Sequence, residues 1–140
     1  MLDTGPIIAY LDPHDPFHSQ VAHGLGEFNG RLCTTSAVIT EAMHFVAPSR
    51  NGPVLLAEFA SVTNIEIYEL SQSAALAEAA ILIQRYRDTP MDYADATLLL
   101  LAEHLDIGAI ATLDRRGFSV YRTRQGKPLQ QVLQLHETHR

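Results

Sequence analysis

The sequence predicts an α/β fold, a three-layer α/β/α sandwich around a mainly parallel central sheet. Short apolar segments alternate with longer segments of helical period, which is typical of strands joined by helices. The 140 residues are 46% hydrophobic, which is enough for a real core. Repeats, long linkers and low-complexity segments are absent from the sequence, so we predict one domain over residues 1–140.

The first quarter of the chain is predicted to contain two strands and two helices. Residues 1–2 form a very short apolar strand. A helical turn over residues 5–11 begins with a proline, which suits the first helical position. Apolar residues recur three and four positions apart over residues 16–28, which predicts an amphipathic helix, and residues 31–34 form the second strand.

The middle of the chain is predicted to continue this alternation with longer helices. Ser36 is placed to cap a helix over residues 36–46, in which the apolar side chains form a stripe. Another helix covers residues 53–62 and leads into a third strand at residues 65–70. A helix rich in alanine and leucine follows at residues 73–86.

The last third of the chain is predicted to complete the sheet. A helix over residues 92–105 ends before a glycine, and the apolar residues 109–113 form the fourth strand. Residues 119–122 are predicted to form a fifth strand at the edge of the sheet. A final short helix is predicted over residues 128–135.

The bulk composition predicts a protein of the cytoplasm. Cys33 is the single cysteine of the chain and cannot form an internal disulfide, which suits a reducing compartment. No apolar run is long enough to cross a bilayer, and no basic stretch followed by an apolar one marks a secretory signal. We therefore expect a cytoplasmic chain without a membrane partner.

Charge is distributed unevenly along the chain. The net charge is −6, but residues 115–140 carry +5 and residues 1–114 carry −11. A basic segment beside an acidic body suits a partner with a phosphate backbone, with cations held by the acids. Arg115 and Arg116, next to Asp114, are the candidates for gripping phosphates. The alternative is a solvated, charged C-terminal segment with no binding role.

Four carboxylates are predicted to converge at one edge of the sheet. Asp3 follows the first predicted strand and Asp114 the fourth, and ligands of parallel sheets collect beyond the carboxyl ends of the strands. Glu41 lies in the helix after the second strand. Asp95 lies in the first turn of the helix before the fourth strand, three residues after Asp92 and on roughly the same face. Such like charges raise each other's pKa, and a hard divalent cation such as Mg²⁺ resolves the repulsion.

Each of these acids also has a structural explanation. Asp3 and Asp92 are placed to act as helix N-caps, and Asp114 is placed to act as a turn residue. Glu41 and Asp95 are harder to explain in this way, because their neighbours are apolar. The joint placement of the acids, rather than any single one, therefore predicts a cation site.

Four segments carry a resemblance to a known family, and they occur in the family's order along essentially the whole chain. They are Leu2-Asp3-Thr4-Gly5-Pro6-Ile7-Ile8-Ala9, Thr35-Ser36-Ala37-Val38-Ile39-Thr40-Glu41, Asp92-Tyr93-Ala94-Asp95-Ala96 and Ala111-Thr112-Leu113-Asp114-Arg115-Arg116-Gly117-Phe118. Each segment alone is a loose motif, but the ordered set is fairly specific. The chain resembles the PIN-domain nucleases and, within that group, the VapC-type toxins.

The resemblance implies an acidic pocket that binds Mg²⁺, or Mn²⁺ in its place, and endonucleolytic cleavage of RNA by metal-activated water. The core acids of the family's pocket correspond to Asp3, Glu41, Asp95 and Asp114. Asp92 corresponds to a possible outer member of the pocket. Thr112 stands where the family often has a hydroxyl that steadies a metal-bound water. Thr4 and Ser36 are lesser candidates for such a role.

The resemblance also implies protein partners and shows one departure. Toxins of this kind pair as homodimers and are held inactive by a small antitoxin whose tail enters the acidic groove. Many members have a further acid where this chain has Gly117, so one tightly held metal is expected rather than two. The same departure keeps open an alternative function, a non-catalytic PIN-like module that binds RNA or a protein.

Overall fold

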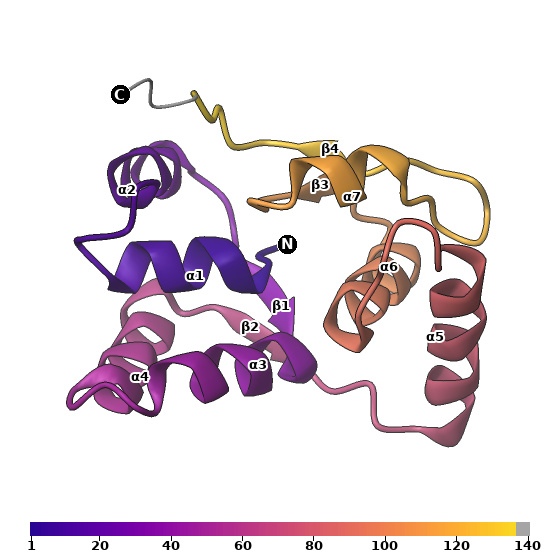
Figure 1. The fold of residues 1–140 in the computed structure, drawn as a ribbon, viewed down its shortest axis with the longest axis horizontal. Helices are drawn as coiled ribbons and strands as arrows, with labels where there is room; N and C mark the ends of the chain where they lie inside the picture. Colours follow the sequence, from indigo (N-terminus) through magenta and orange to yellow (C-terminus); the bar gives the residue numbers. More distant parts are fainter. Residues whose placement is uncertain (137–140) are drawn as a thin grey trace.

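Short parallel strands form the centre of the protein in a computed structural model that describes residues 1–136 (Figure 1). The predicted domain ends at residue 140, and its last residues lie outside the described ones. The strands within residues 1–136 are β1 (Cys33–Thr35), β2 (Glu66–Tyr68), β3 (Ala109–Ile110) and β4 (Gln130–Gln131). β1 pairs in parallel with β2, and β3 pairs in parallel with β4.

The N-terminal residues join these two pairs of strands. Leu2 forms a parallel bridge with Ala111, and the Asp3 amide donates a hydrogen bond of 3.0 Å to the Ala111 carbonyl. On the other side, the Leu2 amide donates to the Cys33 carbonyl at 2.8 Å. The order across the sheet is therefore β2, β1, the N-terminal residues, β3 and β4. The predicted first strand is thus reduced to a single bridge, but it occupies the centre of the parallel sheet.

Helices lie on both sides of these strands (Figure 1). They are α1 (Thr4–Leu11), α2 (His18–Glu27), α3 (Ser36–Val46), α4 (Gly52–Thr63), α5 (Ser73–Arg85), α6 (Tyr93–Leu105) and α7 (Arg115–Val120). α1 packs against α2, α3 and α4, whereas α6 packs against α5, α3 and β1. Within residues 1–136, none of the helices combines the length and the apolar character needed to cross a membrane.

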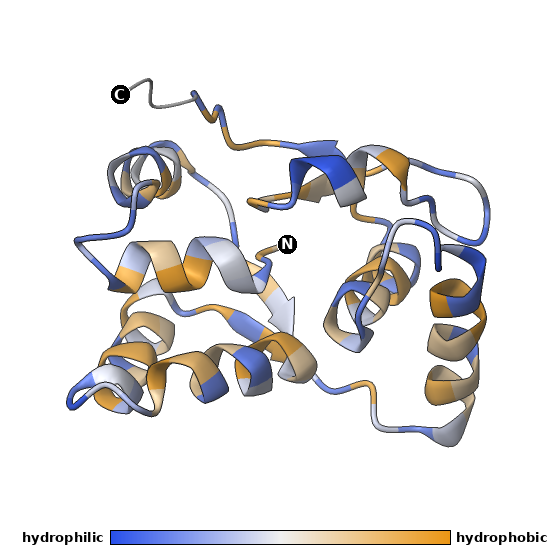
Figure 2. Ribbon diagram, viewed as in Figure 1, coloured by the Kyte–Doolittle hydropathy of each residue, from blue (hydrophilic) through white to orange (hydrophobic). Residues whose placement is uncertain are grey.

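The central helix of the core is α6. Its residues from Ala96 to Ala102 are all buried, as expected of a helix that is apolar on every side. Leu2, Ile110 and Phe118 complete the core from the strands and α7. Figure 2 shows the contrast between the largely apolar α3 and α4 and the strongly hydrophilic first turn of α7.

The predicted edge strand at residues 119–122 is wrong, because this region begins as a helix. The Asp114 carboxylate accepts a hydrogen bond of 3.0 Å from the Gly117 amide and thereby caps α7. Phe118 and Tyr121, three residues apart, are both buried as one face of this helical turn. Only Arg122 pairs as a strand residue, in an isolated antiparallel bridge with Pro128.

The predicted final helix over residues 128–135 is also wrong, because this segment is extended and contains β4. The Gln130 amide donates a hydrogen bond of 2.7 Å to the Gly108 carbonyl, and β4 thereby satisfies the free edge of β3. Leu129 and Leu135 are buried, whereas Gln130 and the other even-numbered residues up to 134 are exposed. This alternation has the period of a strand rather than a helix.

The predicted cap of α3 is one residue out of place. Thr35, not Ser36, is the N-cap, and its hydroxyl accepts a hydrogen bond of 3.3 Å from the Val38 amide. The Thr35 hydroxyl also lies 2.8 Å from the Thr97 hydroxyl, which ties the start of α3 to α6. Ser36 instead donates its hydroxyl proton to the Glu69 carboxylate at 2.9 Å.

Candidate active site

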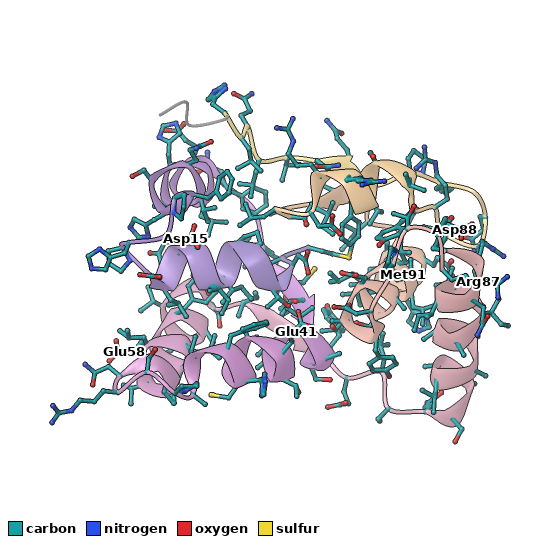
Figure 3. All side chains as sticks on the ribbon, viewed as in Figure 1. Asp15, Glu41, Glu58, Arg87, Asp88 and Met91 are labelled. Carbon is teal, nitrogen blue, oxygen red and sulfur yellow. The ribbon has the colours of Figure 1, made fainter. Side chains whose placement is uncertain are left out.

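The predicted acids meet in one cavity of about 460 Å³ beyond the carboxyl ends of the strands. Its walls include all five of them: Asp3, Glu41, Asp92, Asp95 and Asp114. They come from the starts of α1, α6 and α7 and from the middle of α3. Figure 3 shows Glu41 at the centre of the molecule, on the side of α3 that faces α1. Residues far apart in the sequence are therefore neighbours here.

Three of the aspartates hold their positions because they cap helices. Asp3 Oδ1 accepts a hydrogen bond of 2.8 Å from the Thr4 amide at the start of α1. Asp92 Oδ1 accepts one of 2.7 Å from the Asp95 amide, and Asp114 caps α7 as described above. The predicted N-cap roles of Asp3 and Asp92 are therefore correct, whereas Asp114, predicted as a turn residue, is instead a helix N-cap, and the predicted convergence of the acids is observed. Each cap also directs the positive end of a helix dipole towards the cavity.

Asp95 completes a capping box at the start of α6. Its Oδ2 accepts a hydrogen bond of 3.1 Å from the Asp92 amide, in exchange for the bond that Asp92 receives from the Asp95 amide. Glu41, in contrast, has no capping role because it lies in the body of α3. Its presence in the cavity therefore has no explanation in local helix structure.

Thr112 positions two of the acids at once. Its buried hydroxyl donates a hydrogen bond of 2.8 Å to Asp3 Oδ2 and accepts one of 2.9 Å from the Asp114 amide. With Thr4 on Oδ1 and Thr112 on Oδ2, the Asp3 carboxylate has both oxygens fixed. The hydroxyl proton of Thr112 is thereby committed to Asp3. A role for this hydroxyl in steadying a metal-bound water stays a prediction.

The acids raise one another's pKa. Burial raises the pKa of Asp95 from 3.8 to about 8, with help from the negative charges of Asp3 and Asp92. Burial also raises the pKa of Asp3, although its hydrogen bonds from Thr112 and Thr4 counter part of the increase. Burial raises the pKa of Glu41, and the negative charges of Asp92 and Asp3 raise it further. Without a cation, the cavity therefore retains protons near neutral pH.

The donor set of the cavity suits a hydrated Mg²⁺. Every candidate ligand is an oxygen, and the buried Thr4 hydroxyl in its wall has no hydrogen-bond partner among the described residues. Within residues 1–136, no group of three or more aspartate, glutamate, histidine or cysteine side chains is arranged to bind one metal ion directly, so waters would have to complete the coordination. Mg²⁺ normally keeps several waters and takes only one or two carboxylates directly, so the acids could hold it in this way.

The two arginines predicted to grip phosphates differ in their surroundings. Arg115 donates a hydrogen bond of 3.2 Å to the Leu135 carbonyl, which holds its side chain against the C-terminal segment. Arg116 lines a smaller cavity of about 270 Å³ that shares Asp114 with the acidic cavity. Arg116 is therefore the better placed of the two for a phosphate next to the acids.

Two residues of this region were missed from the sequence. Asp15, in the loop between α1 and α2 (Figure 3), also lines the acidic cavity, and its side chain accepts a hydrogen bond of 2.8 Å from the Phe17 amide. Tyr121 donates a hydrogen bond of 2.6 Å to the Pro90 carbonyl and so holds the segment that leads to Asp92. For Tyr121, the sequence signal that could have been used was its helical spacing of three residues from the apolar Phe118.

Comparison with known proteins identifies the family of this site. The family model of the PIN domain matches residues 1–123. The chain belongs to the PIN-domain family. This PIN domain is 31% identical over 126 residues to ribonuclease VapC26 of Mycobacterium tuberculosis, and the match covers 87% of this chain and 91% of the relative.

A solved structure supports the same fold. The PIN domain superposes on the crystal structure of Mycobacterium tuberculosis VapC20, a toxin described as cleaving the Sarcin-Ricin loop, with a TM-score of 0.75. The match covers 84% of this chain and 92% of VapC20, at 15% sequence identity. The predicted PIN-domain family and α/β/α fold class are thus confirmed.

Proposed function

We propose that this PIN domain is a magnesium-dependent endoribonuclease and the toxin of a toxin–antitoxin pair. One observation carries the proposal, the convergence of Asp3, Glu41, Asp95 and Asp114 in a single cavity. The relatives support it, since one is named a ribonuclease and the other a loop-cleaving toxin. Mn²⁺, which also takes oxygen ligands, is expected to replace Mg²⁺.

Some groups of the cavity hold the carboxylates in place, whereas others have oxygens free to bind a cation. Thr112 and the Thr4 amide fix Asp3, and the capping box fixes Asp92 and Asp95. Among the described residues, Asp95 Oδ1 and Asp114 Oδ2 accept no hydrogen bond, so these oxygens are available to a cation and its waters. When bound, the cation supplies Lewis acidity and a water of lowered pKa.

The RNA backbone must approach a strongly acidic surface, and Arg116 offsets this charge. Its cavity adjoins the acidic one through Asp114, so a phosphate next to the scissile one would lie beside the Arg116 guanidinium. Contacts of this kind position a nucleic acid without reading its sequence. Arg115 contributes positive charge to the same segment.

Two protein partners belong to the proposal. A small antitoxin would cover the acidic cavity, whose walls include the apolar Ile8 and the 61% exposed Phe45. A second copy of the chain would pair through α5, which exposes Leu76 and Ile81 among small alanines. The molar mass in solution, measured by light scattering, would show whether the chain is a dimer.

The activity is tested with purified protein, structured RNA and Mg²⁺. Asp95→Asn should lower the cleavage rate by about 100-fold or more, because it removes a carboxylate charge from the proposed cation site. A chelator should abolish cleavage and Mn²⁺ should restore it. Glu58→Gln is the control, since Figure 3 shows Glu58 on α4, far from Glu41. RNA cut equally well by Asp95→Asn or with chelator present would exclude the proposed mechanism and favour a non-catalytic binding module.

Toxicity is a separate expectation. Expression of the active chain should arrest growth, and co-expression of the neighbouring reading frame should relieve the arrest. Asp95→Asn, produced at the same level, should leave growth unaffected. Normal growth with active, abundant protein would exclude the toxin role while leaving the ribonuclease role intact.

A further inference from the structure

A second and larger cavity adjoins the acidic one. It has a volume of about 630 Å³, within the range of roughly 300–1,000 Å³ that is typical of small-ligand sites. Glu41 and Asp92 line both cavities, so they form the wall between them. A ligand group in the second cavity would therefore lie directly beside a phosphate bound at the acids.

The polar groups of this second cavity are mostly hydrogen-bond acceptors. The Ser36 hydroxyl donates to Glu69 Oε1 at 2.9 Å, and the Thr40 hydroxyl donates to the Ser36 carbonyl at 2.9 Å. The Thr97 hydroxyl donates to the Ala94 carbonyl at 2.7 Å. These hydroxyl protons are thus committed within the protein. His44, Ser71 and the Tyr93 hydroxyl in the wall can still donate, but the carboxylates of Glu41, Glu69 and Asp92 give the cavity an excess of acceptors, so a ligand that brings its own donors is favoured.

Glu69 is the acceptor best placed to read such a ligand. Ser36 orients its carboxylate by binding one oxygen, and no described residue donates a hydrogen bond to the other, Oε2. The side chain is exposed and needs no partner for the stability of the fold. A carboxylate held in this way can accept two parallel hydrogen bonds from adjacent donors on a planar group.

Tyr93 supplies a flat apolar surface in the same cavity. It is the first residue of α6, directly after Asp92, and its side chain is 39% exposed. Its ring stacks on no other aromatic side chain among the described residues. Ala37 and Ala94, also in the wall, are small and leave space beside the ring. An exposed tyrosine ring of this kind stacks on nucleobases.

The chemistry of the cavity excludes other parts of an RNA. A phosphate would face the carboxylates of Glu41, Glu69 and Asp92, against which His44 is the one basic side chain in the described wall. A ribose offers hydroxyl donors but no flat face for Tyr93. A base offers both a flat face and donors on its Watson–Crick edge, which unstacked RNA bases present to proteins.

We propose that this cavity holds the base of the nucleotide beside the scissile phosphate and that it prefers guanine, stacked on Tyr93 and read by Glu69. Guanine presents two adjacent donors, its N1–H and its 2-amino group, to one carboxylate. Adenine and cytosine each present a single amino group on this edge, and uracil presents only one N–H between two carbonyl oxygens. We therefore expect the preference of the cavity to decrease from guanine, through adenine and cytosine, to uracil. This proposal rests on the ribonuclease function proposed above and adds a sequence preference to it.

The first experiment maps the cut sites in a single-stranded RNA pool of random sequence. Wild-type protein with Mg²⁺ should show guanine enriched at one position next to the cut. Glu69→Gln should reduce kcat/KM at guanine sites by about tenfold and flatten the base frequencies, because an amide replaces one acceptor with a donor. Tyr93→Leu should raise KM by about tenfold for every base, because stacking tolerates all bases.

Matched controls separate this effect from general damage. Tyr10→Leu replaces a tyrosine of nearly equal exposure, 38%, on α1, and Glu58→Gln replaces a distant surface glutamate. Both should keep the wild-type base frequencies and KM. Wild-type frequencies retained in Glu69→Gln, or equal KM values for Tyr93→Leu and Tyr10→Leu, would overturn the base pocket while leaving the ribonuclease function standing.

The second experiment measures binding without cleavage, by chemical-shift titration with 5′-GMP and 5′-UMP. GMP should bind about tenfold more tightly than UMP to the wild-type protein, and Glu69→Gln should remove the difference. Equal binding of the two nucleotides would overturn the proposal even if the protein cuts RNA. The proposal would also be overturned if Glu69→Gln and Tyr93→Leu left nucleotide binding unchanged and instead weakened the binding of a co-purified protein. The cavity would then be a protein-docking site. An absence of Mg²⁺-dependent cleavage with intact GMP selectivity would instead overturn the ribonuclease function alone.

Discussion

At the residue scale, Gly117 leaves no room for a side chain in the middle of the site. A β-carbon added there would lie 2.9 Å from Asp114 Cγ and 2.9 Å from Cε2 of Tyr121. The further acid that many PIN domains have at this position therefore could not be added without moving Asp114. The glycine and the capping geometry of Asp114 depend on each other.

Gly117→Asp should consequently destabilise the protein by about 1–3 kcal/mol and reduce RNA cleavage, because overpacking displaces Asp114. Thermal unfolding and the cleavage rate provide the two measurements. Gly108→Asp is the matched control, since a β-carbon at Gly108 meets no atom within 4 Å. A Gly117→Asp protein that is as stable as Gly108→Asp and binds Mg²⁺ more tightly would show that the site accepts a further acid.

The site residues that could be predicted from the sequence are those with a local reason to stand where they do. Asp3, Asp92 and Asp114 were recognisable because caps and strand ends have sequence signals. Asp15 was not, because it reaches the acidic cavity through the path of a loop, which no periodicity records. The different surroundings of Arg115 and Arg116 depend on where the C-terminal segment lies, which is likewise a tertiary property.

At the element scale, the start of α6 serves both the helix and the cavity. Asp92→Ala should lower the free energy of unfolding by about 1 kcal/mol, because it removes the N-cap acceptor of α6. Asp92→Asn should be at least as stable as the wild type without metal, since its side-chain oxygen can still accept the Asp95 amide and its neutral side chain no longer repels the charge of Asp95. Chemical denaturation measures both. Asp88→Ala, on an exposed residue of the same loop (Figure 3), is the control and should change little. Equal stability of Asp92→Ala and Asp88→Ala would contradict the capping role.

The helices and strands of the first three quarters of the chain were predictable because their apolar periods are long or bounded by clear caps. The region after Asp114 was not. α7 is too short for its period to be visible, and its start depends on one side-chain hydrogen bond from Gly117. β4 consists of two glutamines, which have no strong strand preference, and it is extended because the edge of β3 needs a partner.

At the scale of the whole molecule, the acidic cavity opposes folding at neutral pH unless a cation is present. The pKa of Asp95 is about 8 in the folded protein and near its ordinary 3.8 in the unfolded chain. Between these values the folded state binds more protons, so the stability of the metal-free protein falls as pH rises from about 4 to about 8. The raised pKa values of Asp3 and Glu41 act in the same direction.

The melting temperature of the metal-free protein should therefore fall between pH 5 and pH 8, and Mg²⁺ should raise it more at pH 8 than at pH 5. Asp95→Asn should be more stable than the wild type at pH 8 without metal, by at least about 1 kcal/mol or roughly 3–5 °C, and should lose much of the pH slope. Calorimetry in chelator and in Mg²⁺ tests both statements. A wild-type melting temperature that rises with pH in chelator would refute them, and Glu58→Gln should behave as the wild type.

The double use of Asp3, Asp92 and Asp114 as ligand candidates and helix caps has a genetic consequence. Alanine at these positions removes charge and cap together, so the protein would be less stable and more exposed to proteolysis as well as altered at the proposed cation site. Asparagine removes the charge and keeps the cap. Since every aspartate codon becomes an asparagine codon by one G-to-A change, the proposed function implies that inactive yet folded alleles are one mutation away at each of these sites.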